Sequence, residues 1–266
     1  MIAYRNEVIK EHLDEDISKN PEAFNRKVLI VESKFQNIKK LIKLEKEMSF
    51  LDVGSGAGLV VICAAEKGLN SYGIEILPKA VEIAKKNAKL KGVQCNFSIG
   101  INESLPYENN SFDIVYSNSV LEHVGDWEQS VKELVRVLKN KGVLYLATTN
   151  KQHPFTQEIK YFPLFPYYPQ AIQQKIIKWA VKRKPGWVGH MPQGFKIVFH
   201  SYSKIKKLLK ELNCEVCDAI DLYKKESLTG FKRALRPFWK FNRNKMFRWV
   251  LLFYTPSIEF YAIKKG

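Results

Sequence analysis

Apolar residues along the first half of the chain form two alternating patterns. Short apolar runs at 49–53, 71–76, 94–99, 112–117 and 142–148 predict strands, and helix-like spacing at 59–67, 78–88 and 129–138 predicts helices between them. Strands and helices that alternate in this way indicate a parallel sheet covered by helices on both faces. Residues 1–48 also show helical spacing and are expected to precede the sheet as a helical segment.

Two stretches interrupt this pattern and are interpreted as insertions. The first, 151–200, contains a run at 162–169 that is too rich in proline for a regular internal strand or helix. The second, 223–256, mixes basic and aromatic side chains. A helix at 203–212 and strands at 214–222 and 257–263 are expected to complete the sheet. The core therefore comprises 49–150, 201–222 and 257–266.

Composition adds a strong positive charge to this picture. The 266 residues include 43 Lys and Arg against 27 Asp and Glu, a formal net charge of +16. Such a chain is attracted to nucleic acid, anionic lipid or phosphorylated substrates, and charge alone does not choose among them.

Cysteine usage and apolar run length favour a cytoplasmic protein. Four scattered cysteines are too few for a disulfide framework in a chain of this size. The first residues lack the apolar core of a signal peptide, and the longest apolar run, 249–254, is far too short to span a bilayer. Cys214 and Cys217 are three positions apart and should face opposite sides of a strand, so no metal site is expected.

Candidate chemistry begins with three glycines directly after the first expected strand. They stand at every second position behind Asp52, as Gly54, Gly56 and Gly58, and an apolar helix follows at once. Glycines permit a tight turn and close approach of a ligand, and a helix start offers unpaired N–H groups, which suits a nucleotide-like cofactor. A tight turn from strand to helix needs glycine for structural reasons as well, so the triplet alone leaves both interpretations open.

An acidic residue on the next strand strengthens the cofactor interpretation. Glu75 follows Asp52 by 23 positions, where a carboxylate reaches ribose hydroxyls in nucleotide-binding doubly wound sheets. The alternative is an acid that caps the following helix. A nicotinamide dinucleotide is disfavoured because its fingerprint is Gly-x-Gly-x-x-Gly, whereas the spacing here is Gly-x-Gly-x-Gly.

Three further segments, 105–107, 111–115 and 120–124, follow in order. Together with the Asp-x-Gly-x-Gly-x-Gly loop they resemble the class I S-adenosylmethionine-dependent methyltransferases, in particular the small-molecule group that includes quinone and lipid-precursor enzymes. The resemblance covers 41–150 well and 200–222 and 258–264 loosely. It implies an α/β, Rossmann-like doubly wound sheet of seven strands, mostly parallel with the last strand antiparallel, and S-adenosylmethionine as cofactor.

The resemblance also assigns roles to particular residues. It implies that Asp52 holds the amino group of the cofactor, that the glycines line its methionine side, and that Glu75 takes both ribose hydroxyls with Ile76 against the adenine. An aspartate often contacts the adenine amino group at the position where Ile101 stands, and Asn102 or Glu103 is expected to substitute. The full implied set is Asp52, Gly54, Ser55, Gly56, Gly58, Glu75, Ile76, Ile101, Asn102, Glu103 and Asn118.

Methyl transfer from a sulfonium depends mainly on positioning, so no catalytic triad is required. A base is needed only for a protonated, weakly acidic acceptor. His123, after the fourth strand, and His153, beyond the fifth, are the candidate bases, with a structural hydrogen-bonding role as the alternative for each. His200 is expected to be structural.

Acceptor specificity is expected in the two insertions, because loops beyond the carboxyl ends of parallel strands form the binding crevice. Aromatic residues of the first, expected to form a lid, are Phe155, Tyr161, Phe162, Phe165, Tyr167, Tyr168, Trp179 and Trp187. In the second, nine basic residues between Lys224 and Arg248 interleave with aromatic ones. That mixture suits an anionic membrane surface, single-stranded nucleic acid, or a cover packed on the core.

The leading hypothesis is a methyltransferase for a small-molecule or lipid-linked acceptor, peripheral at a membrane. An RNA or DNA methyltransferase is the first alternative, although residues 117–120 lack the Asn-Pro-Pro-aromatic or Asp-Pro-Pro-aromatic tetrapeptide of such enzymes. A non-catalytic binding protein of the same fold is the second. The sequence leaves the methylated atom and the oligomeric state open.

Overall fold

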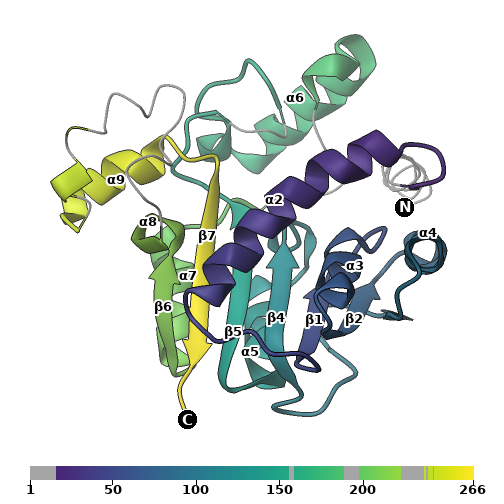
Figure 1. The fold of residues 1–266 in the computed structure, drawn as a ribbon. Coiled ribbons are helices and arrows are strands. Elements are labelled where there is room, and N and C mark those ends of the chain that lie inside the picture. Colours follow the sequence, from purple (N-terminus) through teal and green to yellow (C-terminus); the bar gives the residue numbers. More distant parts are fainter. Residues whose placement is uncertain (1–15, 156–158, 189–197, 223–236, 238, 242) are drawn as a thin grey trace.

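The computed structural model describes residues 16–155, 159–188, 198–222, 237, 239–241 and 243–266. Seven strands form one sheet in the order β3-β2-β1-β4-β5-β7-β6 (Figure 1). They are β1 (Ser49–Val53), β2 (Asn70–Glu75), β3 (Asn96–Ile99), β4 (Phe112–Asn118), β5 (Leu138–Thr149), β6 (Cys214–Asp218) and β7 (Ser257–Lys264). Neighbours among β1 to β5 pair in parallel, and β7 is antiparallel to both β5 and β6. The predicted fold class is confirmed.

Two layers of helices cover the sheet, because its strands bury side chains on both faces. Helices α2 (Pro21–Lys39), α3 (Leu59–Glu66) and α4 (Pro78–Lys91) form one layer, and α5 (Trp127–Val137) and α7 (Tyr202–Glu211) form the other. Adjacent residues of β1 show the alternation that a strand requires: Phe50 packs with Phe35 of α2, whereas Leu51 belongs to the cluster under α5 and α7.

The helical segment expected at 1–48 contains α2, and its first fifteen residues lie outside the described part of the chain. The expected strand at 214–222 is shorter than predicted. It ends at Asp218, and Ala219–Leu222 forms a short helix, α8. The reason is local, since Asp218 Oδ1 accepts the N–H groups of Ile220 and Asp221 at 3.0 and 3.2 Å and so starts a helical turn.

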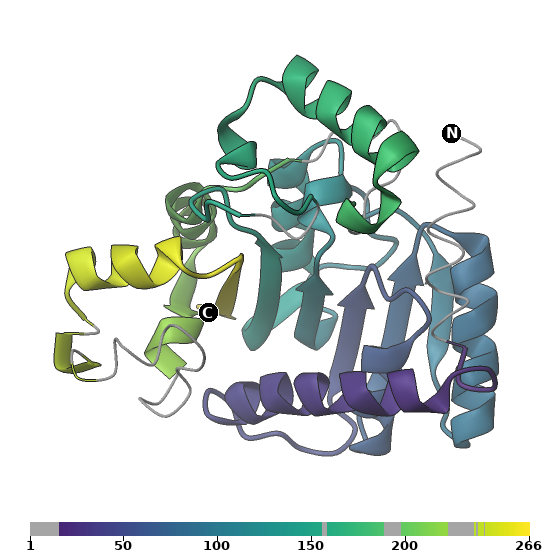
Figure 2. The ribbon, with the colours of Figure 1, turned by 90° about the horizontal axis from the view of Figure 1, so that it is seen from above.

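The first insertion forms a cap with a core of its own. It contains α6 (Gln170–Arg183), a helix that the apolar pattern did not predict, and two 3-10 turns, η2 (Phe165–Tyr167) and η3 (Pro185–Trp187). The residues of its small core are Ile159, Phe165, Ile177 and Ala180. In both ribbon views α6 lies beyond the carboxyl ends of the parallel strands (Figures 1 and 2). A parallel bridge between Asn150 and His200 holds the two ends of the cap together.

The main described element of the second insertion is the helix α9 (Lys245–Phe253), which leads into β7. Most of the basic and aromatic residues before α9 lie outside the described residues. Among the helices that the structure describes, none has the length and apolar character to cross a membrane.

Candidate functional site

The turn between β1 and α3 has the backbone conformation that its three glycines allow. The φ angles of Gly54, Gly56 and Gly58 are 78°, 51° and 84°, all in the left-handed region that other residues rarely adopt. A Cβ on Gly54 would lie 2.3 Å from Cγ2 of Val120. Glycine at this position is therefore required both for the backbone angle and for the close approach of the segment that follows β4.

Glu75 joins the glycine turn to the next helix. Its buried carboxylate accepts the N–H of Gly56 on Oε2 at 3.0 Å and the N–H of Leu77 on Oε1 at 3.1 Å. Leu77 is the N-cap residue of α4, so the carboxylate contacts the start of that helix. The two interpretations drawn from the sequence, a ligand-binding acid and a helix-capping acid, are thus compatible, because each carboxylate oxygen can accept a further hydrogen bond.

Asp52 lies in an environment that disfavours its negative charge. The carboxyl is buried at the end of β1, and this burial, together with the nearby charge of Glu75, raises its pKa well above the usual value. A cation beside the two carboxylates would offset this cost. The pair therefore suits a ligand with a positively charged group, as the amino group and sulfonium of S-adenosylmethionine provide.

Asn102 is the best candidate for recognition of a base edge. It follows β3 and is only 6% exposed, yet neither its Nδ2 nor its Oδ1 has a hydrogen-bond partner among the described residues. A buried amide without partners costs free energy that a hydrogen-bonding ligand would recover. Gly100, two residues earlier, donates its N–H to the Glu75 carbonyl at 3.1 Å, which keeps this segment beside the carboxylate site.

Other residues of the predicted set surround this centre. Ile76 and Ile101 are exposed, as a contact surface for a ligand would be. The carboxylate of Glu103 instead accepts the N–H of Gly125 at 2.8 Å, which gives it a role in holding the loop before α5. Asn118 is exposed at the end of β4.

Ser55 and Ser117 present two buried hydroxyls. Ser55 was in the predicted set and Ser117 was not, and neither Oγ has a partner among the described residues. Ser117 pairs with Val53 in the sheet register, so it lies directly beside the glycine turn. Nothing in the sequence marked Ser117, because its position depends on the pairing of β4 with β1.

The three histidines near the site differ in their environments. His123 is half-buried at the end of a 3-10 turn, η1 (Leu121–His123), that follows β4. His153 has its Nδ1 against the backbone carbonyl of Phe155. Burial lowers the pKa of His200 to about 4, so its neutral ring donates from Nε2 to the Leu121 carbonyl at 3.1 Å. His200 thus fixes η1, in agreement with its expected structural role.

Aromatic residues of the cap pack largely against one another. The Phe162 ring lies 6.4 Å from Trp179, and Trp179 lies 5.9 Å from Trp187, measured between ring centroids. Phe165 is fully buried in the core of the cap. The aromatic residues that were expected to form a lid are therefore held together mainly by contacts with one another.

In the described part of the chain, no group of three or more His, Cys, Asp or Glu could hold a metal ion.

Comparisons with known proteins point to the same elements. Residues 51–146, from β1 to β5, match a family model described as a methyltransferase domain. The chain is 31% identical over 106 residues to a ubiquinone biosynthesis O-methyltransferase from Pelagibacter ubique, a match that covers 40% of this chain and 44% of that protein. It is 32% identical over 132 residues to the uncharacterized methyltransferase YcgJ from Bacillus subtilis, which covers 49% and 52% of the two chains.

Solved structures extend the similarity of fold to most of the chain. The crystal structure of YcgJ covers 88% of this chain and 99% of its own, with a TM-score of 0.53 and 20% identity. The phosphoethanolamine N-methyltransferase 2 from Haemonchus contortus, solved with S-adenosyl-L-methionine, covers 88% of this chain and 53% of its own, with a TM-score of 0.55 and 16% identity. The sequence matches span about half the length of the curated relatives.

Proposed function

We propose that the chain carries a class I S-adenosylmethionine-dependent methyltransferase domain and transfers a methyl group from S-adenosylmethionine to a small-molecule acceptor. The observation that carries the proposal is the joint arrangement of the glycine turn, Glu75 and Asp52. The glycines of the turn permit close approach of a ligand to the backbone, and the two buried carboxylates favour a ligand that is both hydroxylated and cationic.

Several residues are suited to hold the cofactor. Asp52 would take the amino group, Glu75 the ribose hydroxyls and Asn102 the edge of the adenine, with Ile76 against the face of the base. The cofactor supplies the methyl group and a sulfonium leaving group. Since displacement at a sulfonium needs chiefly alignment, the contribution of the protein is to fix the donor and the acceptor in line.

His123 is the preferred candidate for a base where the acceptor must lose a proton. It follows β4, whose carboxyl end lies beside the glycine turn, and η1 is fixed by the hydrogen bond from His200 to Leu121. His153 is the second candidate, with one ring nitrogen already engaged by the Phe155 carbonyl. A base that is positioned in this way is required for hydroxyl acceptors and dispensable for thiolates or free amines.

The cap is the structural feature expected to select the acceptor. It lies beyond the carboxyl ends of the strands and exposes several large apolar side chains, among them Phe155, Tyr161 and Tyr167. An apolar or aromatic small molecule is the acceptor class that such a surface favours. The names of two similar proteins, one acting in ubiquinone biosynthesis and one on phosphoethanolamine, agree with a small-molecule acceptor.

A lipid-linked acceptor reached at an anionic membrane is a finer proposal, favoured by α9. Its outward face carries Met246, 77% exposed, and Trp249, 54% exposed, next to the exposed Lys245. The Arg248 side chain is instead largely buried and pairs with Asp218 and Asp221. Apolar and basic side chains side by side on an exposed helix suit an anionic bilayer surface.

Binding and transfer are tested separately. Calorimetric titration with S-adenosylhomocysteine should give a single site, and labelled S-adenosylmethionine should transfer its methyl group to a member of a panel of quinols, phenols and amines. Transfer to RNA instead would favour the nucleic-acid alternative, and binding without any transfer would favour the non-catalytic one. Absence of binding would refute the proposal.

The membrane proposal has its own test. Co-sedimentation with vesicles that contain anionic lipid should retain the protein, and zwitterionic vesicles should not. Met246→Ser with Trp249→Ser should weaken retention, while Lys79→Ser, an exposed position on α4, should not. Equal retention of both variants would contradict the role of α9.

A further inference from the structure

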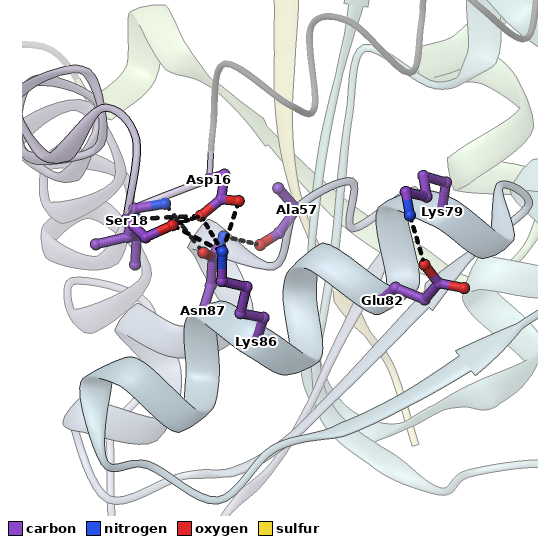
Figure 3. Close-up of polar contacts among 8 residues, drawn as sticks. Asp16, Ser18, Ala57, Lys79, Glu82, Lys86 and Asn87 are labelled. Carbon is purple, nitrogen blue, oxygen red and sulfur yellow. Dashed lines mark hydrogen bonds and ion pairs between the residues drawn. The ribbon is translucent and has the colours of Figure 1, made fainter.

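The side chain of Asn87 connects two parts of the chain that are far apart in sequence. It lies on the inner face of α4 and is fully buried. Its Oδ1 accepts the N–H of Ile17 at 3.0 Å, and its Nδ2 donates to the carbonyl of Ala57 at 3.0 Å (Figure 3). Ala57 stands between Gly56 and Gly58, so one amide links the N-terminal segment to the glycine turn.

Asparagine at this position has a cost that these bonds help to offset. The neighbouring inner positions of α4 are apolar, with Ala84 and Ala88 one turn before and one residue after. Asparagine is a weaker helix former than alanine, and burial of an unpaired amide is unfavourable. Both ends of the amide have a partner, so loss of either the Ile17 or the Ala57 contact would remove a hydrogen bond from a fully buried polar group.

A second set of contacts, made by Asp16, holds the same N-terminal segment, residues 16–18, against α4. The buried carboxylate of Asp16 forms an ion pair with Lys86 at 2.9 Å and accepts the hydroxyl and the N–H of Ser18 at 2.6 and 3.1 Å (Figure 3). Lys86 also donates to the Ser18 hydroxyl at 2.7 Å. Asp16 is thereby placed so that the N–H of the next residue meets Asn87.

An apolar cluster also packs the N-terminal segment and α2 against α3 and α4. Phe24 of α2 is buried against Ile62 of α3 and Ala88 of α4, and Ile17 packs at its edge. Ile62 lies in the first turn of α3, whose N-cap is Gly58, so the segment contacts both the start of α3 and the inner face of α4.

We infer that Asn87 is a positioning residue for the cofactor, through which docking of residues 16–18 on α4 stabilises the ligand-binding conformation of the glycine turn. The inference rests on the proposed function, because it concerns the same cofactor site. The coupling is reciprocal by thermodynamic linkage: docking that strengthens cofactor binding must itself be strengthened when the cofactor binds.

Two matched substitutions, each at the acidic partner of a lysine on α4, test the coupling. Asp16→Asn removes the charge that pairs with Lys86, and Glu82→Gln makes the same chemical change in the Lys79–Glu82 pair, which is also 2.9 Å long and lies exposed on the same helix (Figure 3). Asn87→Ala removes the link itself. Calorimetry with S-adenosylhomocysteine should show an affinity about fivefold or more weaker for Asp16→Asn and Asn87→Ala. Glu82→Gln should stay within about twofold of the wild type.

Hydrogen exchange supplies a readout that a purely structural role would not produce. In the wild type and in Glu82→Gln, S-adenosylhomocysteine should slow exchange in the peptide that covers 16–24, and in Asp16→Asn this protection should be markedly reduced. If Asn87→Ala does not fold, Asp16→Asn still decides the outcome.

The possible failures are distinguishable. A wild type that does not bind S-adenosylhomocysteine would refute the proposed function and this inference with it. Normal wild-type binding with equal affinities for Asp16→Asn and Glu82→Gln would refute the inference alone. A lower melting temperature of Asp16→Asn with unchanged affinity would likewise overturn it, because the segment would then stabilise the fold without acting on the turn.

Discussion

The N–H of Gly56 donates a hydrogen bond to Oε2 of Glu75 across 3.0 Å, so the glycine turn after β1 and the end of β2 form one unit. The other carboxylate oxygen holds the start of α4 through Leu77. A single side chain therefore connects three elements around the candidate cofactor site. A change at Glu75 should affect ligand binding more than the same change at an exposed carboxylate.

Glu75→Gln should weaken S-adenosylhomocysteine binding by about tenfold or more. The amide keeps the size of the side chain, but it replaces one charged acceptor with a donor, and hydrogen bonds to charged groups contribute roughly 1.5–3 kcal/mol. Calorimetry measures the effect, with Glu82→Gln as the control. Equal affinities for the two variants would exclude Glu75 as a ligand.

Gly54→Ala should reduce stability more than Gly92→Ala. Both glycines have positive φ angles, 78° and 67°, so both substitutions impose backbone strain of about 1–2 kcal/mol. A Cβ at Gly54 would also lie 2.3 Å from Val120 Cγ2, whereas nothing lies within 4 Å at Gly92. The clash should add about 1–3 kcal/mol, measured as the difference between the two free energies of unfolding in urea. Equal losses of unfolding free energy in the two variants would contradict the clash, because the segment around Val120 would then move aside without cost.

His200 should make the protein less stable as the pH falls below 6.5. Burial lowers its folded-state pKa to about 4, so between pH 6.5 and 4 the unfolded chain binds a proton that the folded chain does not. The free energy of unfolding should therefore fall by up to roughly 1.4 kcal/mol per pH unit in this window. Urea unfolding of wild type and His200→Gln at several pH values measures it. The variant should show a shallower dependence, and parallel curves would contradict the assignment.

Arg248→Met should destabilise the attachment of α9. Arg248 Nη1 lies 2.7 Å from Asp221 Oδ1, and Nη2 contacts the buried carboxylate of Asp218. Loss of the guanidinium leaves that carboxylate with fewer partners, at a cost of about 2 kcal/mol. Lys245→Met, at an exposed position of the same helix, is the control and should change the free energy of unfolding little. A smaller effect at Arg248 than at Lys245 would contradict the contact.

The local sequence patterns of the chain were sufficient to predict most of the strands and helices of the core. β1 was predicted to its exact ends, and α3 and α4 begin where predicted, because their apolar spacing and the adjoining glycines or proline are local signals. The strand from Cys214 was overextended, because the turn at Asp218 depends on where one carboxylate points. α6 was missed, since its few buried residues face the cap and not the main core.

The sequence by itself determined the motif behind the resemblance to S-adenosylmethionine-dependent methyltransferases, because the spacing of Gly54, Gly56 and Gly58 between Asp52 and Glu75 is a covalent property of the chain. Only the tertiary structure decided which buried polar groups have partners. Asn102 is unpaired among the described residues, whereas Asn87 bridges Ile17 and Ala57. Two asparagines that look alike in the sequence differ because burial and hydrogen bonding are set by segments that meet only when the chain has folded.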